Sequence, residues 1–201
     1  MTKQKPNLRE TILRTVFFFI AWFFIATIIS YFTLPDGILR SSNVAKDVSE
    51  QSSFLAFVFS IVIRNLIPAI GLCIGCLAAI RIRNCNYPFA YLGLFTMFTI
   101  NGVTLGTWSF SVTHEAVPGL FPRLLRTFDL LHRAGLWEMV GLCLLVAALT
   151  NAAIVQISDG KPVIDAKNFK LTKSEILCLV CGFLLLVVAA VVESNAVITR
   201  M

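Results

Sequence analysis

Long apolar runs divide the chain, and they constrain its fold more than any other feature of the sequence. A helix rises about 1.5 Å per residue, so about 20 apolar residues match the hydrocarbon core of a bilayer. Apolar side chains make up 57% of the 201 residues and charged ones only 14%, whereas soluble domains carry roughly a quarter charged residues. So few polar groups cannot coat a water-soluble globule. The sequence therefore predicts an all-α integral membrane protein.

We expect a single membrane domain over residues 1–201, with about five transmembrane helices. The expected spans cover about residues 15–34, 65–80, 89–112, 136–155 and 176–193. The first run follows a basic leader and is longer than the apolar core of a cleaved signal peptide, which favours a retained first helix.

Two shorter segments predict helices that lie in the membrane interface, at about residues 53–63 and 119–133. The first would end at a break near Arg64 and Asn65, because the apolar stretch around them is longer than one span needs. The second has apolar residues at helical spacing with Arg123, Arg126 and Asp129 between them, which is typical of an amphipathic helix.

The distribution of basic residues predicts the orientation in the cell membrane. The net charge of +6 does not indicate a nucleic-acid partner, because the Lys and Arg residues are scattered between apolar runs and form no patch. With the N-terminus in the cytoplasm and the C-terminus outside, ten Lys and Arg residues face the cytoplasm and six face outward. The expected partners are membrane lipid and either another protein or further copies of the chain.

Three ionisable residues lie within or at the rim of the expected spans, namely Arg64, Glu138 and Glu193. An ionised side chain at the bilayer centre costs at least about 2.5 kcal/mol, so such residues pair, face water or reach the headgroups. All three would lie toward the outer leaflet, where they could form a polar intramembrane cluster with Asn65 and Asn101. Separate contacts with headgroups are the alternative interpretation.

Glycines four residues apart occur in two of the expected spans, as Gly71 with Gly75 and as Gly102 with Gly106. This spacing lets two helix backbones approach closely, and it is a common packing device in lipid. We therefore expect helix packing at these pairs. The amide of Asn101, beside Gly102, needs a hydrogen-bond partner if it is buried.

The sequence offers few groups for chemistry, and we expect no enzyme, no cofactor and no metal site. The pairs Cys73 with Cys76 and Cys178 with Cys181 have the spacing of zinc ligands. Both pairs lie in apolar spans, however, where a free cysteine commonly behaves as a small buried hydrophobe. An intramembrane hydrolase would need a nucleophile and a base in a defined geometry. The nearest candidates in sequence are Ser109, Ser111 and His114.

Several short motifs follow one another in a characteristic order. They are Ile63-Arg64-Asn65-Leu66, Gly71-x-x-x-Gly75, Ile100-Asn101-Gly102-x-x-Leu105-Gly106, Gly135-Leu136-Trp137-Glu138 and Ala189-Ala190-Val191-Val192-Glu193. In this order the motifs resemble the stage II sporulation protein M family, over about residues 10–198. The chain departs from the family at Arg64, where the family typically has asparagine, and before Glu138, where the signature histidine is displaced to His132.

The resemblance implies a multi-span membrane protein without catalysis of its own. The founding member of the family scaffolds peptidoglycan-degrading partners, and other relatives accompany ABC-type transport or immunity to membrane-active peptides. The first hypothesis is therefore a scaffold or subunit of a membrane complex in cell-envelope remodelling, with an envelope hydrolase complex as partner. The alternative is a permease, transport or peptide-immunity component that works with a transporter ATPase and uses the polar cluster.

Overall fold

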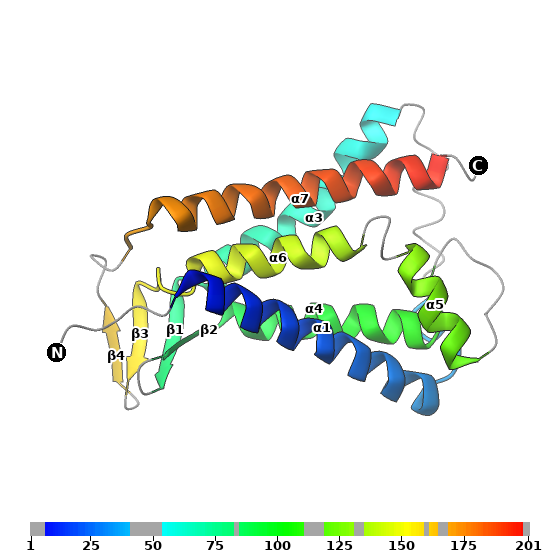
Figure 1. Cartoon of the computed structure of the whole chain (residues 1–201), viewed down its shortest axis with the longest axis horizontal. Coiled ribbons are helices and arrows are strands. Elements are labelled where there is room, and N and C mark those ends of the chain that lie inside the picture. The colour runs from blue at the N-terminus through cyan, green and yellow to red at the C-terminus, as the bar shows by residue number, and fades with distance from the viewer. Residues whose placement is uncertain are drawn as a thin grey trace.

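The computed structural model describes residues 7–40, 54–82, 85–110, 119–130, 135–158, 161–164 and 169–198. Helices form a bundle with a four-stranded sheet at one end (Figure 1). The helices are α1 (Leu8–Thr33), α3 (Phe54–Gly75), α4 (Ala90–Gly106), α5 (Leu120–Leu130), α6 (Leu136–Leu149) and α7 (Lys173–Ile198). The strands are β1 (Ala78–Ile82), β2 (Cys85–Pro88), β3 (Val155–Ser158) and β4 (Lys161–Ile164).

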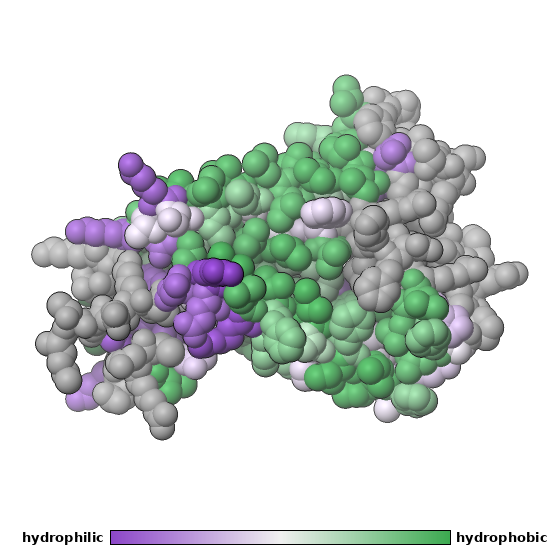
Figure 2. All heavy atoms as spheres, viewed as in Figure 1, coloured by the Kyte–Doolittle hydropathy of each residue, from purple (hydrophilic) through white to green (hydrophobic). Residues whose placement is uncertain are grey.

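Three helices are long and apolar enough to cross a membrane. They are α1, the Val58–Gly75 part of α3, and the Lys173–Asn195 part of α7, whereas α4 and α6 are apolar but shorter. Apolar residues cover the visible surface of the helices, and hydrophilic ones gather toward the end that carries the sheet (Figure 2). The chain is thus mostly helical with three candidate membrane spans, and the expectation of an all-α fold is wrong because a small sheet is present.

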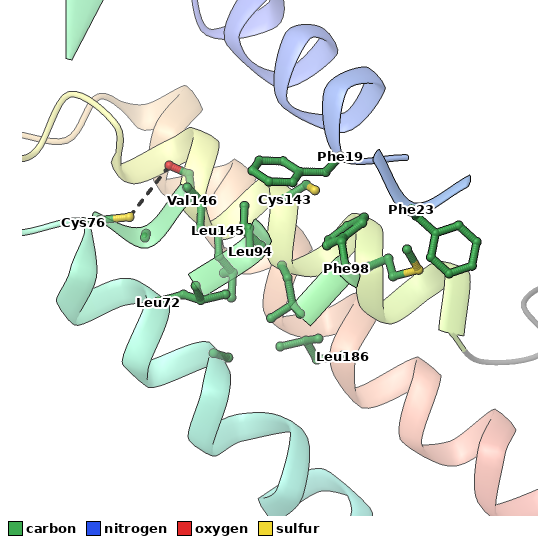
Figure 3. Packing of buried hydrophobic residues seen from close by; sticks show 14 of the residues in the cluster. Phe19, Phe23, Leu72, Cys76, Leu94, Phe98, Cys143, Leu145, Val146 and Leu186 are labelled. Atoms are coloured by element: carbon green, nitrogen blue, oxygen red, sulfur yellow. Dashed lines mark hydrogen bonds between the residues drawn. The ribbon is translucent and has the colours of Figure 1, made fainter. Parts of the chain in front are cut away.

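Helix α6 is the centre of the bundle. Nearly all of its residues from Met139 to Leu149 are buried, and it packs along α7 and also against α1 and α3. Helices α1 and α4 pack along each other, with the rings of Phe19 and Phe98 5.3 Å apart. Figure 3 shows these two rings beside Cys143 of α6, so one apolar core joins the helices.

Helix α3 is continuous through Arg64 and Asn65, so the predicted break at these residues is wrong, as is a separate helix at 53–63. Residue 53 itself lies outside the described residues. Neither Arg nor Asn breaks a helix by its backbone, and even Pro68 is accommodated inside α3. The side chain of Arg64 is exposed, so the helix continues through this residue without burying its charge.

The expected spans 65–80 and 136–155 are too long at their C-terminal ends, because the chain leaves the helix at Gly75 and at Leu149. Strands β1 and β3 follow, and they pair in parallel with Ala78 opposite Val155. β-branched residues are frequent in both strands, which favours an extended backbone over a last helical turn. The expected span 89–112 likewise ends as a helix at Gly106, and residues 111 and 112 lie outside the described part.

The sheet joins two connections that are far apart in the sequence. Its order is β2-β1-β3-β4, in which β1 and β2 form one antiparallel hairpin and β3 and β4 form another. Figure 1 places this sheet at the end of the bundle where α1 and α7 begin, and α5 at the opposite end. The two ends therefore carry different structures, a sheet at one and an amphipathic helix at the other.

Candidate functional site

A buried arginine fastens α5 to the rest of the bundle. The side chain of Arg123 is 4% exposed and donates to both carboxylate oxygens of Asp36, at 2.7 and 2.8 Å. The same guanidinium donates to the carbonyl of Gly106 at 2.6 Å and lies 5.0 Å from the centre of the Tyr31 ring. A planar guanidinium suits such paired contacts better than an ammonium group does. We call this group of four residues the Arg123 clamp.

The segment that carries Asp36 is itself bonded to the C-terminal end of α4. The amide of Gly37 donates to the Thr107 carbonyl at 2.7 Å, and the amide of Leu39 donates to the Ser109 hydroxyl at 3.1 Å. Arg40 donates to the Trp108 carbonyl at 3.3 Å. The Arg123 clamp therefore rests on backbone that is held in place by further hydrogen bonds.

Trp108 lies in a conformation that a bulky residue rarely adopts. Its φ is +49°, and its side chain is 2% exposed. Its indole nitrogen is buried without a hydrogen-bond partner among the described residues. Backbone strain of this kind costs about 1–3 kcal/mol and persists only where the surroundings impose it. Here the surroundings are the bonded loop and the packed ring of Phe110, 5.3 Å away.

Charge holds the carboxylate of Asp36 in its ionised form. The hydrogen bonds from Arg123 lower the pKa of Asp36 from its ordinary value, and the positive charges of Arg123 and Arg40 act in the same direction. Partial burial opposes this shift but does not reverse it. The ion pair is therefore present at neutral pH and joins a buried cation to a half-exposed anion.

Helix α5 turns apolar side chains outward beside the Arg123 clamp. Phe121 is 70% exposed and Leu125 is 55% exposed, while Arg123 between them points inward. The amphipathic helix expected at 119–133 is present as α5, but Arg123, one of the polar residues between its apolar positions, points inward and is neutralised by Asp36. The side chains of Arg126 and Asp129, and residues 131–133, lie outside the described part of the chain.

Three of the residues expected in the polar intramembrane cluster are electrostatically coupled. Arg64 of α3 acts on the carboxyl of Glu193 in α7, and Glu193 acts on Glu138 in the first turn of α6. These three helices pack together, which accounts for the coupling. Asn65, next to Arg64, has a buried amide nitrogen without a hydrogen-bond partner among the described residues.

Asn101 is separate from these residues in its contacts. Its side chain is exposed on α4, and among the described residues it makes no side-chain hydrogen bond. The neighbouring Gly102 faces α1, so the two residues lie on different sides of α4. Asn101 is therefore not joined to Arg64, Glu138 or Glu193 by any described hydrogen bond.

The glycines differ in what surrounds them. A Cβ at Gly102 would lie 2.8 Å from the carbonyl oxygen of Phe23, and one at Gly106 would overlap the carbonyl of Thr27 and the hydroxyl of Ser30. A Cβ at Gly75 would lie 3.1 Å from the backbone nitrogen of Ala90, whereas one at Gly71 would meet nothing within 4 Å. Close packing is thus present at three of the four predicted positions.

Sequence reasoning missed a further glycine contact, between α6 and α7. A Cβ at Gly141 would lie 2.9 Å from the carbonyl oxygen of Gly182, and the reverse contact has the same distance. Neither glycine has a second glycine four residues away, so the spacing rule that picked out the other pairs could not find them. They explain how α6 and α7 pack so closely.

Cys76, Cys143 and Cys178 are buried, as small apolar side chains would be. The thiol of Cys76 donates to the Val146 carbonyl at 4.0 Å (Figure 3), and that of Cys178 donates to the Leu144 carbonyl at 3.5 Å. Within the described ranges, no three His, Cys, Asp or Glu residues are grouped so that they could hold a metal ion.

Ser109, one of the candidates for a nucleophile, is part of the loop structure. Its hydroxyl lies 2.6 Å from that of Thr107 and accepts the hydrogen bond from Leu39 described above. Ser111 and His114 lie outside the described residues. The described contacts therefore give Ser109 a structural role.

Comparison with known proteins finds no matching family model, no matching curated protein and no matching solved structure.

Proposed function

We propose that the protein is a non-catalytic, multi-span membrane protein that acts as a scaffold or subunit of a membrane complex, in the manner of stage II sporulation protein M. The observation that carries this proposal is the Arg123 clamp, which fixes an amphipathic helix with its apolar side chains outward. A rigidly held helix with exposed Phe121 and Leu125 offers a preorganised surface to a partner, and preorganisation lowers the cost of association.

In this proposal five helices cross the membrane, namely α1, α3, α4, α6 and α7. At about 1.5 Å per residue, α4 with its 17 residues measures about 26 Å and α6 with its 14 residues about 21 Å. Both are apolar and pack in the core beside the longer helices, and short spans are accommodated by local thinning of the bilayer. The N-terminus then lies in the cytoplasm, and α5 lies on the outer side.

The partner expected from this arrangement is a protein on the outer side, of the envelope-hydrolase kind. Phe121 and Leu125 together form the apolar centre of the proposed contact, in which the ring of Phe121 offers the larger area for burial. Arg123 is not available for contact because its side chain is buried.

Site-specific photo-crosslinking in cells tests this function. A photoreactive residue at position 121 or 125 should capture one defined protein, and the same residue at Leu184, which is 58% exposed on α7, should capture only lipid. The captured protein should bind the purified chain and lose binding to the Phe121→Asp variant. Capture of lipid alone at both α5 positions would count against the scaffold role.

A second candidate function is a transport component that uses the polar intramembrane cluster. The coupling of Arg64, Glu193 and Glu138 across three helices favours it, because charged residues within spans often mark an ion or substrate pathway. In this case the partner would be a transporter ATPase, or an ion gradient would supply the energy.

Ion flux into proteoliposomes distinguishes this second candidate from the first. If the cluster conducts, Glu138→Gln and Glu193→Gln should abolish proton or sodium flux while the protein is still produced and folded. Equal flux in the variants and the original chain, or no flux in any of them, would rule out a conducting role for the cluster. The flux result does not change what photo-crosslinking at α5 is expected to show, so the two candidate functions are tested separately.

A further inference from the structure

The small sheet has one apolar face and one polar face. Side chains of paired residues lie on the same side of a sheet, so the register assigns each residue to a face. Ile80 is paired with both Tyr87 and Ile157, and Val155 is paired with Ile164. The opposite face carries Arg81, Asn86, Gln156, Val163 and Lys161. We call these the apolar sheet face and the polar sheet face.

Much of the apolar sheet face is exposed in the described part of the chain. Ile164 is 75% exposed, Ile82 56%, Tyr87 45% and Ile80 41%. Strand β1 instead buries Ala79, which belongs to the polar sheet face. An antiparallel or mixed sheet in water normally turns its apolar face to the core and its polar face to solvent. The described helices and strands therefore leave the apolar sheet face open to a further covering.

The connections to the helices keep this face near a membrane surface. Only Cys76 and Leu77 separate β1 from α3, which is one of the helices long enough to cross a membrane. Only Phe89 separates β2 from α4, and Phe89 and Leu92 are themselves exposed. A chain spans at most about 3.6 Å per residue, so the hairpin of β1 and β2 is confined to the neighbourhood of the headgroups. A cytosolic partner would have to compete with lipid for this position.

The charge at this end of the bundle matches an anionic leaflet. In the described parts of 7–14, 76–89 and 156–175 the basic residues are Arg9, Arg14, Arg81, Lys161, Lys170 and Lys173, and the acidic ones are Glu10 and Glu175. Among the described residues, Glu10 is bonded to Arg14, and Glu175 accepts hydrogen bonds from Thr172. Aliphatic, tyrosine and basic side chains together are the composition of segments that bind at the interface of anionic membranes.

We propose that the apolar sheet face lies on the cytoplasmic leaflet and binds anionic phospholipid. Ile80, Ile82 and Tyr87 contact the boundary between the headgroups and the acyl chains, and the lipid phosphates are contacted by Arg9, Lys170 and Lys173, near the starts of α1 and α7. The sheet is then a lipid-binding element attached to the helices. This inference rests on the membrane location and the cytoplasmic N-terminus proposed above, but not on the role proposed for α5.

Quenching of tryptophan fluorescence by brominated lipid tests this proposal. Tryptophan is placed at Ile82, on the apolar sheet face, or at Val163, which is 53% exposed on the polar sheet face and serves as the matched control. The full-length chain is reconstituted in vesicles of phosphatidylcholine and phosphatidylglycerol with bromine near the glycerol backbone. The emission added by Ile82→Trp, relative to the original chain, should be lost, and that added by Val163→Trp should remain.

A second variant guards against a local folding defect at position 82. Tyr87→Trp replaces one aromatic ring by another on the same face, so its added emission should be lost in the same way. Added emission that survives at both positions, as it would if a protein or a second copy covered the face, overturns the proposal. Equal quenching by brominated phosphatidylcholine and brominated phosphatidylglycerol, at the same bromine content, overturns its anionic part.

Discussion

At the scale of single residues, Arg123 determines where α5 lies. Its guanidinium contacts three separate parts of the chain: the Asp36 turn, the end of α4 at Gly106 and the Tyr31 ring of α1. Burying a cation is costly unless its hydrogen bonds are made, and here the carboxylate and carbonyl oxygens make them. Removing Asp36 should therefore destabilise the docking of α5 more than is usual for a half-exposed acidic residue, because the partner cation is buried.

We expect Asp36→Asn to release α5 from the bundle. The change leaves the guanidinium of Arg123 buried without its counter-ion, which costs about 3 kcal/mol and corresponds to roughly hundredfold faster amide exchange in α5. Hydrogen exchange measured by mass spectrometry checks this. The control is Glu10→Gln, because the Glu10–Arg14 pair is highly exposed and contributes little. Unchanged exchange in α5 of Asp36→Asn would show that the Arg123 clamp does not hold the helix.

The same contact predicts how α5 responds to acid. The pKa of Asp36 is lower in the folded chain than its ordinary value of 3.8, so the ionised carboxylate stabilises the docked helix at every pH above that value. The stabilisation is lost as the pH falls through the lowered pKa. Limited proteolysis of α5 should therefore be constant from neutral pH down to about pH 4 and increase below it. The Asp36→Asn variant should lack this acid-dependent step.

The sequence could not predict the Arg123 clamp. The spacing of apolar residues correctly predicts a helix in this region, but an arginine between apolar positions has the same pattern whether it points to solvent or inward. Asp36 lies far from Arg123 in the sequence, and only tertiary packing brings the two charges together. The glycine spacing, in contrast, acts locally on the helix surface, and it correctly identified Gly102 and Gly106.

At the scale of elements, the bundle is built from helix pairs that approach closely at glycines. Gly102 and Gly106 of α4 rest on the backbone of α1, and Gly141 of α6 meets Gly182 of α7. Close approach of backbones increases dispersion contact, which drives helix association where lipid removes the hydrophobic effect.

Alanine substitutions at two glycines should have opposite outcomes. Gly102→Ala places a methyl group against the Phe23 carbonyl and the Ala26 side chain, and overpacking of this kind costs about 1–3 kcal/mol. Gly71→Ala meets open space and gains helix propensity, so it should be neutral or slightly stabilising. Thermal unfolding in detergent, followed by circular dichroism, measures both. An equal loss of Tm in the two variants would contradict this account of the packing.

Strand β1 and the predicted break in α3 are places where the local sequence pattern and the tertiary structure disagree. Residues from Ala78 to Ile82 continue an apolar run, and an apolar run is compatible with a buried helix or a strand. Their extended conformation depends on pairing with β3, which the sequence does not reveal. At Arg64 and Asn65 the polar side chains suggested a break, but neither residue type interrupts a helix through its backbone and α3 continues.

At the scale of the whole molecule, the sheet requires two connections to lie on the same side of the membrane. Strands β1 and β2 follow α3, and β3 and β4 follow α6, yet all four belong to one sheet. The Asp36 turn and α5 lie together at the other end through the Arg123 clamp. This pairing of connections is what five spans would produce, whichever side of the membrane holds the N-terminus.

Epitope tags test this arrangement directly. A tag inserted between β1 and β2 and a tag inserted between β3 and β4 should both be protected from antibody in intact cells and reached after permeabilisation. A tag placed after α5 should be reached without permeabilisation. Labelling of the two sheet tags from opposite sides of the membrane would be incompatible with the parallel pairing of β1 and β3.

The parallel pairing of β1 with β3 also sets an order of events during synthesis. Ala78 emerges from the ribosome long before Val155, its partner, and the N-terminal part of a chain generally folds first. One edge of the β1–β2 hairpin therefore stays open until α4, α5 and α6 have been made, and an open edge can pair with a wrong chain. When β3 closes this edge, backbone hydrogen bonds join the connection that follows α3 to the connection that follows α6. The β1–β2 hairpin therefore has to wait for more than half of the remaining chain before its partner strand exists.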